Sequence, residues 1–136
     1  MLFRSPFVVP KRVIGARVPT PEQRALAIAR LRTVMTKCAG VVRTAKGLRK
    51  ALDELGAIEL EAKNDSVLAN MVLTARLITA AALQRKESRG GHFRSDYPKR
   101  NDALATRTFM TLAALEALEG KPAQGPSAAT LADCRT

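Results

Sequence analysis

The residues of this chain best suited to chemistry gather in one short stretch, positions 86–98. This stretch holds two acids, two arginines and the only histidine of the chain: Glu87, Asp96, Arg89, Arg94 and His92. Such side chains form ion pairs, exchange protons, and donate hydrogen bonds to carboxylates or carbonyls. By composition alone, the commonest outcome is that the acids and arginines pair with one another on a solvent-exposed surface. His92 would then be an ordinary loop histidine without a chemical role.

Two glycines and a proline shape the backbone of this stretch. Gly90 and Gly91 are expected to stop a preceding helix, because glycine adopts the left-handed C-cap conformation without steric penalty. Pro98 disfavours helical geometry at Tyr97, so an extended loop should follow the glycines. We expect a loop of this kind to be held against another part of the protein.

The order and spacing of these residues resemble a known motif. Glu87-Ser88-Arg89-Gly90-Gly91-His92 followed by Asp96-Tyr97-Pro98 resembles the C-terminal signature shared by L-aspartate oxidases and the flavoprotein subunits of succinate dehydrogenase and fumarate reductase. Residues 39–52 add a second match, which is closer to the helix–turn–helix of L-aspartate oxidases than to the dehydrogenase version. The resemblance implies a C-terminal helical domain of an L-aspartate oxidase.

The resemblance also implies a role for the loop, as a joint between domains. The candidate interface residues are Glu87, Ser88, Arg89, Gly90, Gly91, His92, Arg94, Asp96 and Tyr97. The implied partners are the flavin-binding and capping domains of the parent flavoprotein, with Arg89 and Arg94 donating across the joint. A joint without its partner should leave these groups solvated. The competing interpretation makes Arg89 and Asp96 an internal clamp that ties the loop to the helices.

The parent enzyme would use FAD to oxidise L-aspartate to iminoaspartate, the first step of NAD biosynthesis through quinolinate. Flavoproteins of this class bind FAD through a GxGxxG turn that opens a helix. The sequence contains no such turn, and Gly90-Gly91 follows a predicted helix instead of preceding one. The family's catalytic residues lie in earlier domains. We therefore assign no catalytic or cofactor-binding residue here and expect a non-catalytic brace.

Composition predicts one small all-α domain. The 136 residues allow a single core, and hydrophobic residues make up 46% but aromatic residues only 4%, which favours close-packed helices over strands. We expect a three-helix bundle with a C-terminal loop and a further short helix over residues 20–120. A linker or tail over residues 1–19 and a flexible tail over residues 121–136 should flank it.

The first two helices have clear start signals. Thr20 as N-cap, Pro21 at the first helical position and Gln23 in a capping box predict a helix that ends near residue 38. Thr44 is expected to cap a second helix. The predicted apolar stripe of this second helix is Leu48, Ala51, Leu52 and Leu55. At the corner, Gly40 should let two helix backbones approach, with Val41 and Val42 pinning the turn.

A third helix is expected over residues 66–89, and because its middle is apolar almost all round it should be central. The residues expected to face partner helices are Leu68, Met71, Val72, Ala75, Ile78, Ala82 and Leu83. No apolar run is long enough to predict a membrane span. Asn101 or Asp102 should cap a further segment, and residues 104–112 fit either a helix or a short strand.

Charge and cysteine content limit the other functions. The net charge of +11 arises from residues 1–50, which hold twelve basic residues and one acid. Such a basic half suits nucleic acid, but without interleaved aromatics to stack bases this partner is disfavoured. Two cysteines outside any CxxC pair and a single histidine predict no metal site and a cytoplasmic location. A dehydrogenase-type flavoprotein fragment and an independent basic helical binding module remain the alternatives.

Overall fold

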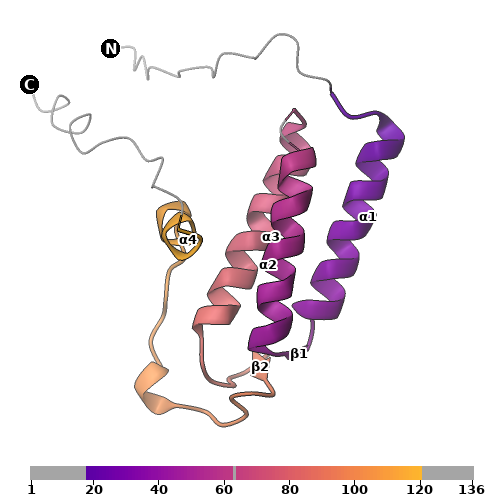
Figure 1. Ribbon diagram of the computed structural model, residues 1–136. Helices are drawn as coiled ribbons and strands as arrows, with labels where there is room; N and C mark the ends of the chain where they lie inside the picture. The colour runs from indigo at the N-terminus through magenta and orange to yellow at the C-terminus, as the bar shows by residue number, and fades with distance from the viewer. Residues whose placement is uncertain (1–17, 63, 121–136) are drawn as a thin grey trace, which may run out of the picture.

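The computed structural model describes residues 18–62 and 64–120, and the described chain is almost entirely helical (Figure 1). Three long helices lie side by side: α1 (Pro21–Cys38), α2 (Ala45–Glu61) and α3 (Ser66–Gln84). A short helix, α4 (Leu112–Leu118), follows a long connection and packs against α3. The all-α prediction is confirmed. The predicted tail over residues 121–136 and nearly all of the predicted linker lie outside the described residues.

The predicted helix starts of α1 and α2 are confirmed. The Thr20 hydroxyl accepts from the Gln23 amide, while the Thr20 amide donates to the Gln23 side chain at 2.9 Å, which completes the capping box. Thr44 accepts from the Gly47 amide at 3.0 Å and opens α2. Asp65 accepts from the first amides of α3. Side chains therefore satisfy backbone donors that each helix leaves without an internal partner.

The core lies where α1, α2 and α3 meet. Its buried members are Ala27 and Leu31 of α1, Leu55, Ile58 and Ala62 of α2, and Leu68, Val72 and Ala75 of α3. Each large aliphatic side chain contributes about 1.5–3 kcal/mol by leaving water. Alanine between the larger residues lets the backbones approach closely. In the predicted stripe of α2, Leu52 is the exception, because it is only partly buried.

Helix α3 packs against α1, α2 and α4, but one of its predicted core residues is wrong. Ile78 is 51% exposed, whereas Arg76 is only 4% exposed. The Arg76 guanidinium pairs with Glu59 of α2 and Glu119, which follows α4. The Arg76 cation therefore lies in the packed interior, within a helix whose sequence is otherwise mostly apolar. It links α3 to α2 and to the end of α4.

The predicted end of α3 is also wrong, because the helix stops at Gln84 instead of continuing to residue 89. Arg85 takes an extended conformation with ψ 102°. The terminal carbonyls of Ala82 and Leu83 accept hydrogen bonds from the Arg94 guanidinium at 3.0 and 3.2 Å. A side chain from the following loop thus caps the helix, and no glycine is needed there.

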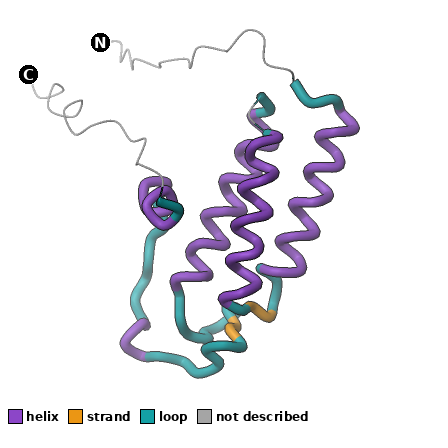
Figure 2. The backbone as a smooth tube through the Cα atoms, in the orientation of Figure 1, coloured by secondary structure: helices purple, strands orange, loops and turns teal. Residues whose placement is uncertain are grey.

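The corner between α1 and α2 differs from the prediction. Val41 and Val42 are 81% and 59% exposed, so they do not pin the turn. Instead, strand β1 (Val42–Arg43) pairs in parallel with strand β2 (Phe93–Arg94), shown in orange in Figure 2. A Cβ on Gly40 would lie 2.5 Å from the carbonyl oxygen of Thr36. Glycine is therefore required by the last turn of α1 itself, and not by an approach of two helices.

Residues 105–111 are neither helix nor strand. Asn101 caps a short 3-10 turn, Asp102–Leu104, by accepting from the Ala103 amide at 3.1 Å. The chain then runs without regular structure until Thr111 caps α4. Leu115, which is 1% exposed, anchors α4 to the bundle.

By length and apolar composition, α3 could cross a membrane, which the sequence prediction had excluded. A central helix of a bundle meets the same two conditions, because it too is long and surrounded by apolar neighbours. The buried residues of α3 are Leu68, Val72, Ala75, Arg76, Thr79, Ala80 and Ala82.

Candidate functional site: an ion-pair network at one end of the bundle

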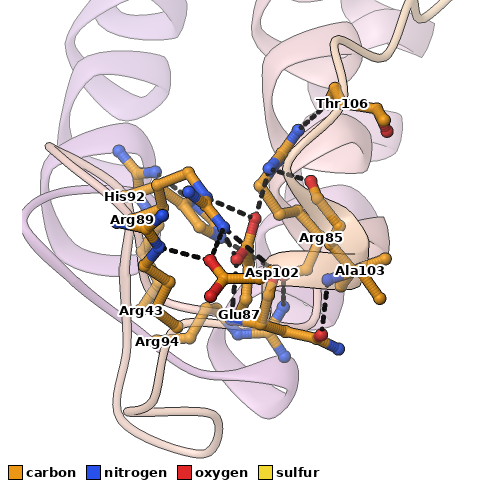
Figure 3. A network of polar contacts seen from close by, with 12 residues as sticks. Arg43, Arg85, Glu87, Arg89, His92, Arg94, Asp102, Ala103 and Thr106 are labelled. Atoms are coloured by element: carbon orange, nitrogen blue, oxygen red, sulfur yellow. Dashed lines mark hydrogen bonds and ion pairs between the residues drawn. The ribbon is translucent and has the colours of Figure 1, made fainter.

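The predicted loop lies at the end of the bundle where α3 ends and α2 begins (Figure 2). The structure brings its charged residues into two adjoining clusters, which Figure 3 shows at close range. One cluster centres on Glu87, which is 0% exposed, and the other on Arg94, which is 1% exposed. Ionised groups this deeply buried require close partners of opposite charge.

The Glu87 carboxylate is held from three sides. Arg85 donates to one oxygen, and Nε of Arg89 lies 3.1 and 3.2 Å from the two oxygens. The Asn101 amide donates to Glu87 at 3.0 Å. Glu87 therefore links the returning chain near Asn101 to the loop. Figure 3 shows Glu87 beside Arg85 and Arg89.

These contacts keep Glu87 ionised. The Arg89 hydrogen bond, followed by the Asn101 amide and Arg85, outweighs the cost of burial and lowers the pKa of Glu87 from 4.5 to about 2. Arg85 also donates to the carbonyls of Leu104 and Thr106 at 3.2 and 3.0 Å. The Glu87 cluster thus organises the connection that leads to α4.

Arg94 forms the second cluster and uses its whole guanidinium group. Nε and Nη2 each lie 2.7 Å from an oxygen of Asp96, which is a bidentate pair. Nη1 donates to carbonyls at the end of α3. The guanidinium carbon lies 5.1 Å from the centre of the Tyr97 ring, which adds a cation–π contact.

Asp96 links the loop to a second helix. Its Oδ2 accepts from the Ala45 amide at the start of α2 at 2.9 Å. The bidentate hydrogen bonds from Arg94, together with this amide, hold the pKa of Asp96 far below its ordinary value. Arg94 and Asp96 together join the last turn of α3 to the first turn of α2.

His92 connects the loop to the corner after α1. Its Nδ1 lies 2.8 Å from Nη1 of Arg43, and its Nε2 lies 3.2 Å from the Arg85 carbonyl oxygen. Because a guanidinium can only donate, Nδ1 must accept and Nε2 must carry the proton. Burial, together with the nearby arginines, lowers the pKa of His92. The imidazole is therefore neutral and structural.

The two glycines and Ser88 complete the loop. Arg89 and His92 exchange two backbone hydrogen bonds of 2.8 and 3.1 Å across a tight turn. Gly90 has φ +57°, so glycine is needed in this turn, although not as the helix cap that the sequence predicted. Ser88 accepts from the Arg94 amide at 2.9 Å and lies 2.8 Å from the Tyr97 carbonyl oxygen.

The prediction of a solvated loop is wrong for Glu87 and Arg94. The internal clamp exists, but its pairing differs from the predicted one, because Arg94 binds Asp96 while Arg89 binds Glu87. The role of the nine loop residues in a domain joint stays a prediction. Tyr97 and Asp96 are exposed, and Gly90 and Gly91 form an outward turn.

Sequence reasoning missed three members of the network. Arg85 was assigned to the helix interior, Asn101 was taken only as a cap, and Arg43 received no role. Arg43 donates to the carbonyls of Ala39 and Gly40 at 3.2 and 2.8 Å and so closes the end of α1. The available signal for Arg43 was its place shortly after the end of α1, where a cation can meet free carbonyls.

The described residues do not fit a flavin site. The Gly90-Gly91 turn joins two extended segments, and it opens no helix whose first amides could bind a pyrophosphate. Within residues 18–62 and 64–120, no group of three or more His, Cys, Asp or Glu side chains could hold a metal ion. The charged groups of the loop pair with one another, which is typical of an ion-pair network that stabilises structure.

Known proteins resemble this chain over the same region. The model of the family described as fumarate reductase flavoprotein C-term matches residues 66–125. The L-aspartate oxidase of Rhodospirillum rubrum is 43% identical over 78% of this chain and 38% of the relative. The L-aspartate oxidase of Caulobacter vibrioides is 43% identical over 69% of this chain and 17% of the relative. The chain thus spans well under half of these relatives.

A solved structure supports the same assignment. The structure titled Mycobacterium smegmatis Sdh1 in complex with UQ1 is 32% identical, with a TM-score of 0.53, over 57% of this chain and 16% of that one. Sequence and backbone therefore agree on the kind of protein to which this chain is similar. The chain belongs to the C-terminal helical domain of the fumarate reductase and succinate dehydrogenase type of flavoprotein, in the form found in L-aspartate oxidases.

Proposed function

We propose that this chain serves as the C-terminal helical domain of an L-aspartate oxidase, the FAD-dependent enzyme that oxidises L-aspartate to iminoaspartate in NAD biosynthesis. The observation that carries this proposal is the 43% identity to two L-aspartate oxidases over 78% and 69% of the chain. Because the flavin is bound elsewhere in such a protein, the contribution of this chain is mechanical.

Within the parent enzyme, the bundle acts as a brace for the flavin-binding and capping domains. The ion-pair network supports this role, because it fixes the loop against the ends of α1, α2 and α3 and leaves an ordered outer surface. Tyr97, at 38% exposed, and Phe93, at 40% exposed, offer apolar contact on that surface. We place the enzyme in the cytoplasm, which the free thiol of Cys38 supports.

A second candidate is the corresponding domain of a succinate dehydrogenase or fumarate reductase flavoprotein. The description of the matching family and the likeness to Sdh1 favour it. The two candidates share the brace role but differ in the substrate on which the parent acts, so they are separated by testing which truncated parent enzyme the chain restores.

The experiment combines the purified chain with a Rhodospirillum rubrum L-aspartate oxidase that lacks its own matching C-terminal segment. Alone, the chain should show no flavin absorption and should produce no hydrogen peroxide from L-aspartate. In the mixture, the two proteins should co-elute and oxidise L-aspartate but not succinate.

Three outcomes would count against the proposal. A flavin spectrum in the purified chain alone would refute the mechanical role. Restored succinate oxidation by a succinate dehydrogenase flavoprotein that lacks its own matching segment, without restored L-aspartate oxidation by the truncated L-aspartate oxidase, would favour the second candidate. Failure to co-elute with the truncated enzyme would argue against the brace.

A further inference from the structure

We propose that the groove between α2 and α4 binds a short acidic, leucine-bearing segment of a protein partner. The proposal goes beyond the brace role and does not depend on which substrate the parent enzyme oxidises. It rests on the shape of the groove, the two cations at its rim and the charge of this end of the bundle.

The groove is a cavity of about 300 Å³, at the lower end of the range for ligand pockets. Its walls come from α2, the end of α3, the ion-pair loop and α4. Its apolar surface is formed by Ala45, Leu52, Ala80, Leu83, Leu115 and Leu118. A surface of this kind takes aliphatic side chains from water at a gain of roughly 25 cal/mol for each Å² buried.

Two cations without partners stand at the rim. Arg49 and Lys86 are exposed, and neither forms an ion pair within the part of the chain that the structure describes. The other charged groups of the lining are already engaged, since Arg94 pairs with Asp96 and Glu119 pairs with Arg76. The groove therefore presents unneutralised positive charge beside an apolar floor.

The whole end of the bundle strengthens this field. Residues 37–50 and 85–102 contain eleven basic residues and only three acids. The three acids, Glu87, Asp96 and Asp102, are all paired within the network. Charges of one sign concentrated around a cleft raise the local concentration of an oppositely charged partner.

The second half of the groove sets the orientation of the partner. A cavity of about 540 Å³ shares Arg49, Leu52, Leu83 and Leu118 with the first and continues along α2 past Asp53 and Gly56. The carboxylate of Asp53 disfavours partner acids there. The acidic side chains of the partner should thus lie at the Lys86 end, with leucine side chains extending toward Gly56.

The wall supplied by α4 is fastened from both sides, so the groove is preformed. Leu115 is buried against the bundle, and Glu119 pairs with Arg76 of α3. Leu118 is 51% exposed and faces the groove lining, where a partner side chain would cover it. A single tyrosine, Tyr97, lines the groove, which is too little stacking surface to favour nucleic acid.

The test measures fluorescence anisotropy of the full chain with a short fluorescein-labelled peptide of alternating glutamate and leucine. The peptide should bind, and replacing its glutamates with glutamine or its leucines with serine should each weaken binding by about tenfold. Competition by heparin or single-stranded RNA separates general attraction to the basic surface from binding in the groove.

Matched variants locate the site. The double variant Arg49→Glu/Lys86→Glu should weaken binding by about tenfold or more, whereas Arg32→Glu/Arg107→Glu, with the same charge change at exposed positions outside the groove and the two basic segments, should stay within about twofold. Leu118→Ser should also weaken binding, and Leu60→Ser, at a comparably exposed leucine of α2 outside the groove, should not. Circular dichroism checks that each variant folds.

The proposal is overturned if the peptide does not bind the chain. It is also overturned if the two charge variants weaken peptide binding by the same factor. It is also overturned if the leucine-to-serine peptide binds as well as the parent peptide, because the apolar floor would then have no part. If the chain bound single-stranded RNA more tightly than the peptide, and both charge variants lost RNA binding equally, the basic surface would be assigned to nucleic acid.

Discussion

At the scale of single residues, Arg94 is the side chain on which the loop depends most. It is 1% exposed, holds Asp96 through two hydrogen bonds of 2.7 Å, and caps the carbonyls that end α3. Removing Arg94 would leave the carbonyls of Ala82 and Leu83 without their donor, whereas water can reach Asp96, which is exposed.

We predict that Arg94→Ala lowers the free energy of unfolding by about 1–3 kcal/mol, because buried carbonyls at the end of α3 lose their donor. Arg94→Lys should lie between this variant and the parent, because an ammonium keeps the charge but loses the bidentate geometry. Arg32→Ala, at an exposed arginine of α1, should change stability by less than about 0.5 kcal/mol. Urea unfolding of the four proteins gives these values, and equal midpoints for Arg94→Ala and Arg32→Ala would refute the clamp.

Glu87 predicts a pH dependence. Because folding lowers its pKa from 4.5 to about 2, the unfolded chain binds more protons between these values. The stability that ionised Glu87 contributes is therefore complete above its unfolded pKa and is lost as the pH falls through the folded value. In urea titrations across this interval, Glu87→Gln should lose less stability on acidification than the parent.

The control for this prediction is Asp53→Asn, which removes an exposed carboxylate of α2. This variant controls for the loss of one negative charge. If Glu87→Gln and the parent lost stability with the same slope between these pH values, the carboxylate of Glu87 would not be ionised within the network.

The residue types of the loop were readable from sequence, but their partners were not. Glu87 and Arg94 stood out by type and spacing, whereas their burial depends on the chain returning near Asn101 and on the start of α2. Those contacts join positions 14 and 51 residues apart, as for Glu87 with Asn101 and Asp96 with Ala45. Local spacing carries no information about such distant pairs.

At the scale of elements, α3 shows that an apolar residue in a helical pattern is not always buried. Leu68 is 1% exposed and Ile78 is 51% exposed on the same helix. Leu68→Ala should lower stability by about 2–5 kcal/mol, because it opens a cavity in the core. Ile78→Ala should cost less than about 1 kcal/mol. Comparable losses in thermal or urea unfolding would mean that α3 is rotated from its described position.

Gly40 lies in the corner before α2, and Gly56 lies within α2. Substitution by alanine should change the stability of the protein in opposite directions at these two positions. A Cβ at Gly40 would collide with the Thr36 carbonyl oxygen, whereas one at Gly56 would meet no atom within 4 Å. Gly40→Ala should destabilise by about 1–3 kcal/mol. Gly56→Ala should stabilise by about 0.5–1 kcal/mol, since alanine is the better helix former. A stabilising Gly40→Ala in melting experiments would contradict the described corner.

The helix starts and the end of α1 near residue 38 were predictable, but the end of α3 was not, for a physical reason. Thr20 and Thr44 cap amides within three residues, so the signal is local. The end of α3 is set by Arg94, which lies beyond a turn and reaches back to carbonyls of the helix. The Gly90-Gly91 pair, taken as the helix stop, therefore placed the predicted end at residue 89, several residues too late.

At the scale of the whole molecule, the bundle is electrostatically one-sided. The ends of α1, α2 and α3 that meet the loop gather the basic residues, while acids such as Glu59, Glu61 and Asp65 lie toward the opposite end of α2 and α3. Such an arrangement orients an approaching anionic partner before contact. Net charge identifies the surface that an anionic partner would approach, but it names no particular partner. The family resemblance was therefore the better guide to function.

The central claim is that this bundle completes an L-aspartate oxidase. Its most direct measurement is the rate of L-aspartate oxidation by a chimera in which residues 18–120 of this chain replace the matching segment of the Caulobacter vibrioides enzyme. The chimera should retain FAD and oxidise L-aspartate within about tenfold of the parent rate, since the flavin site is untouched and the brace is restored. The enzyme without any C-terminal segment should lose most of this activity. A chimera that folds and binds FAD but oxidises L-aspartate no faster than the truncated enzyme would contradict the claim.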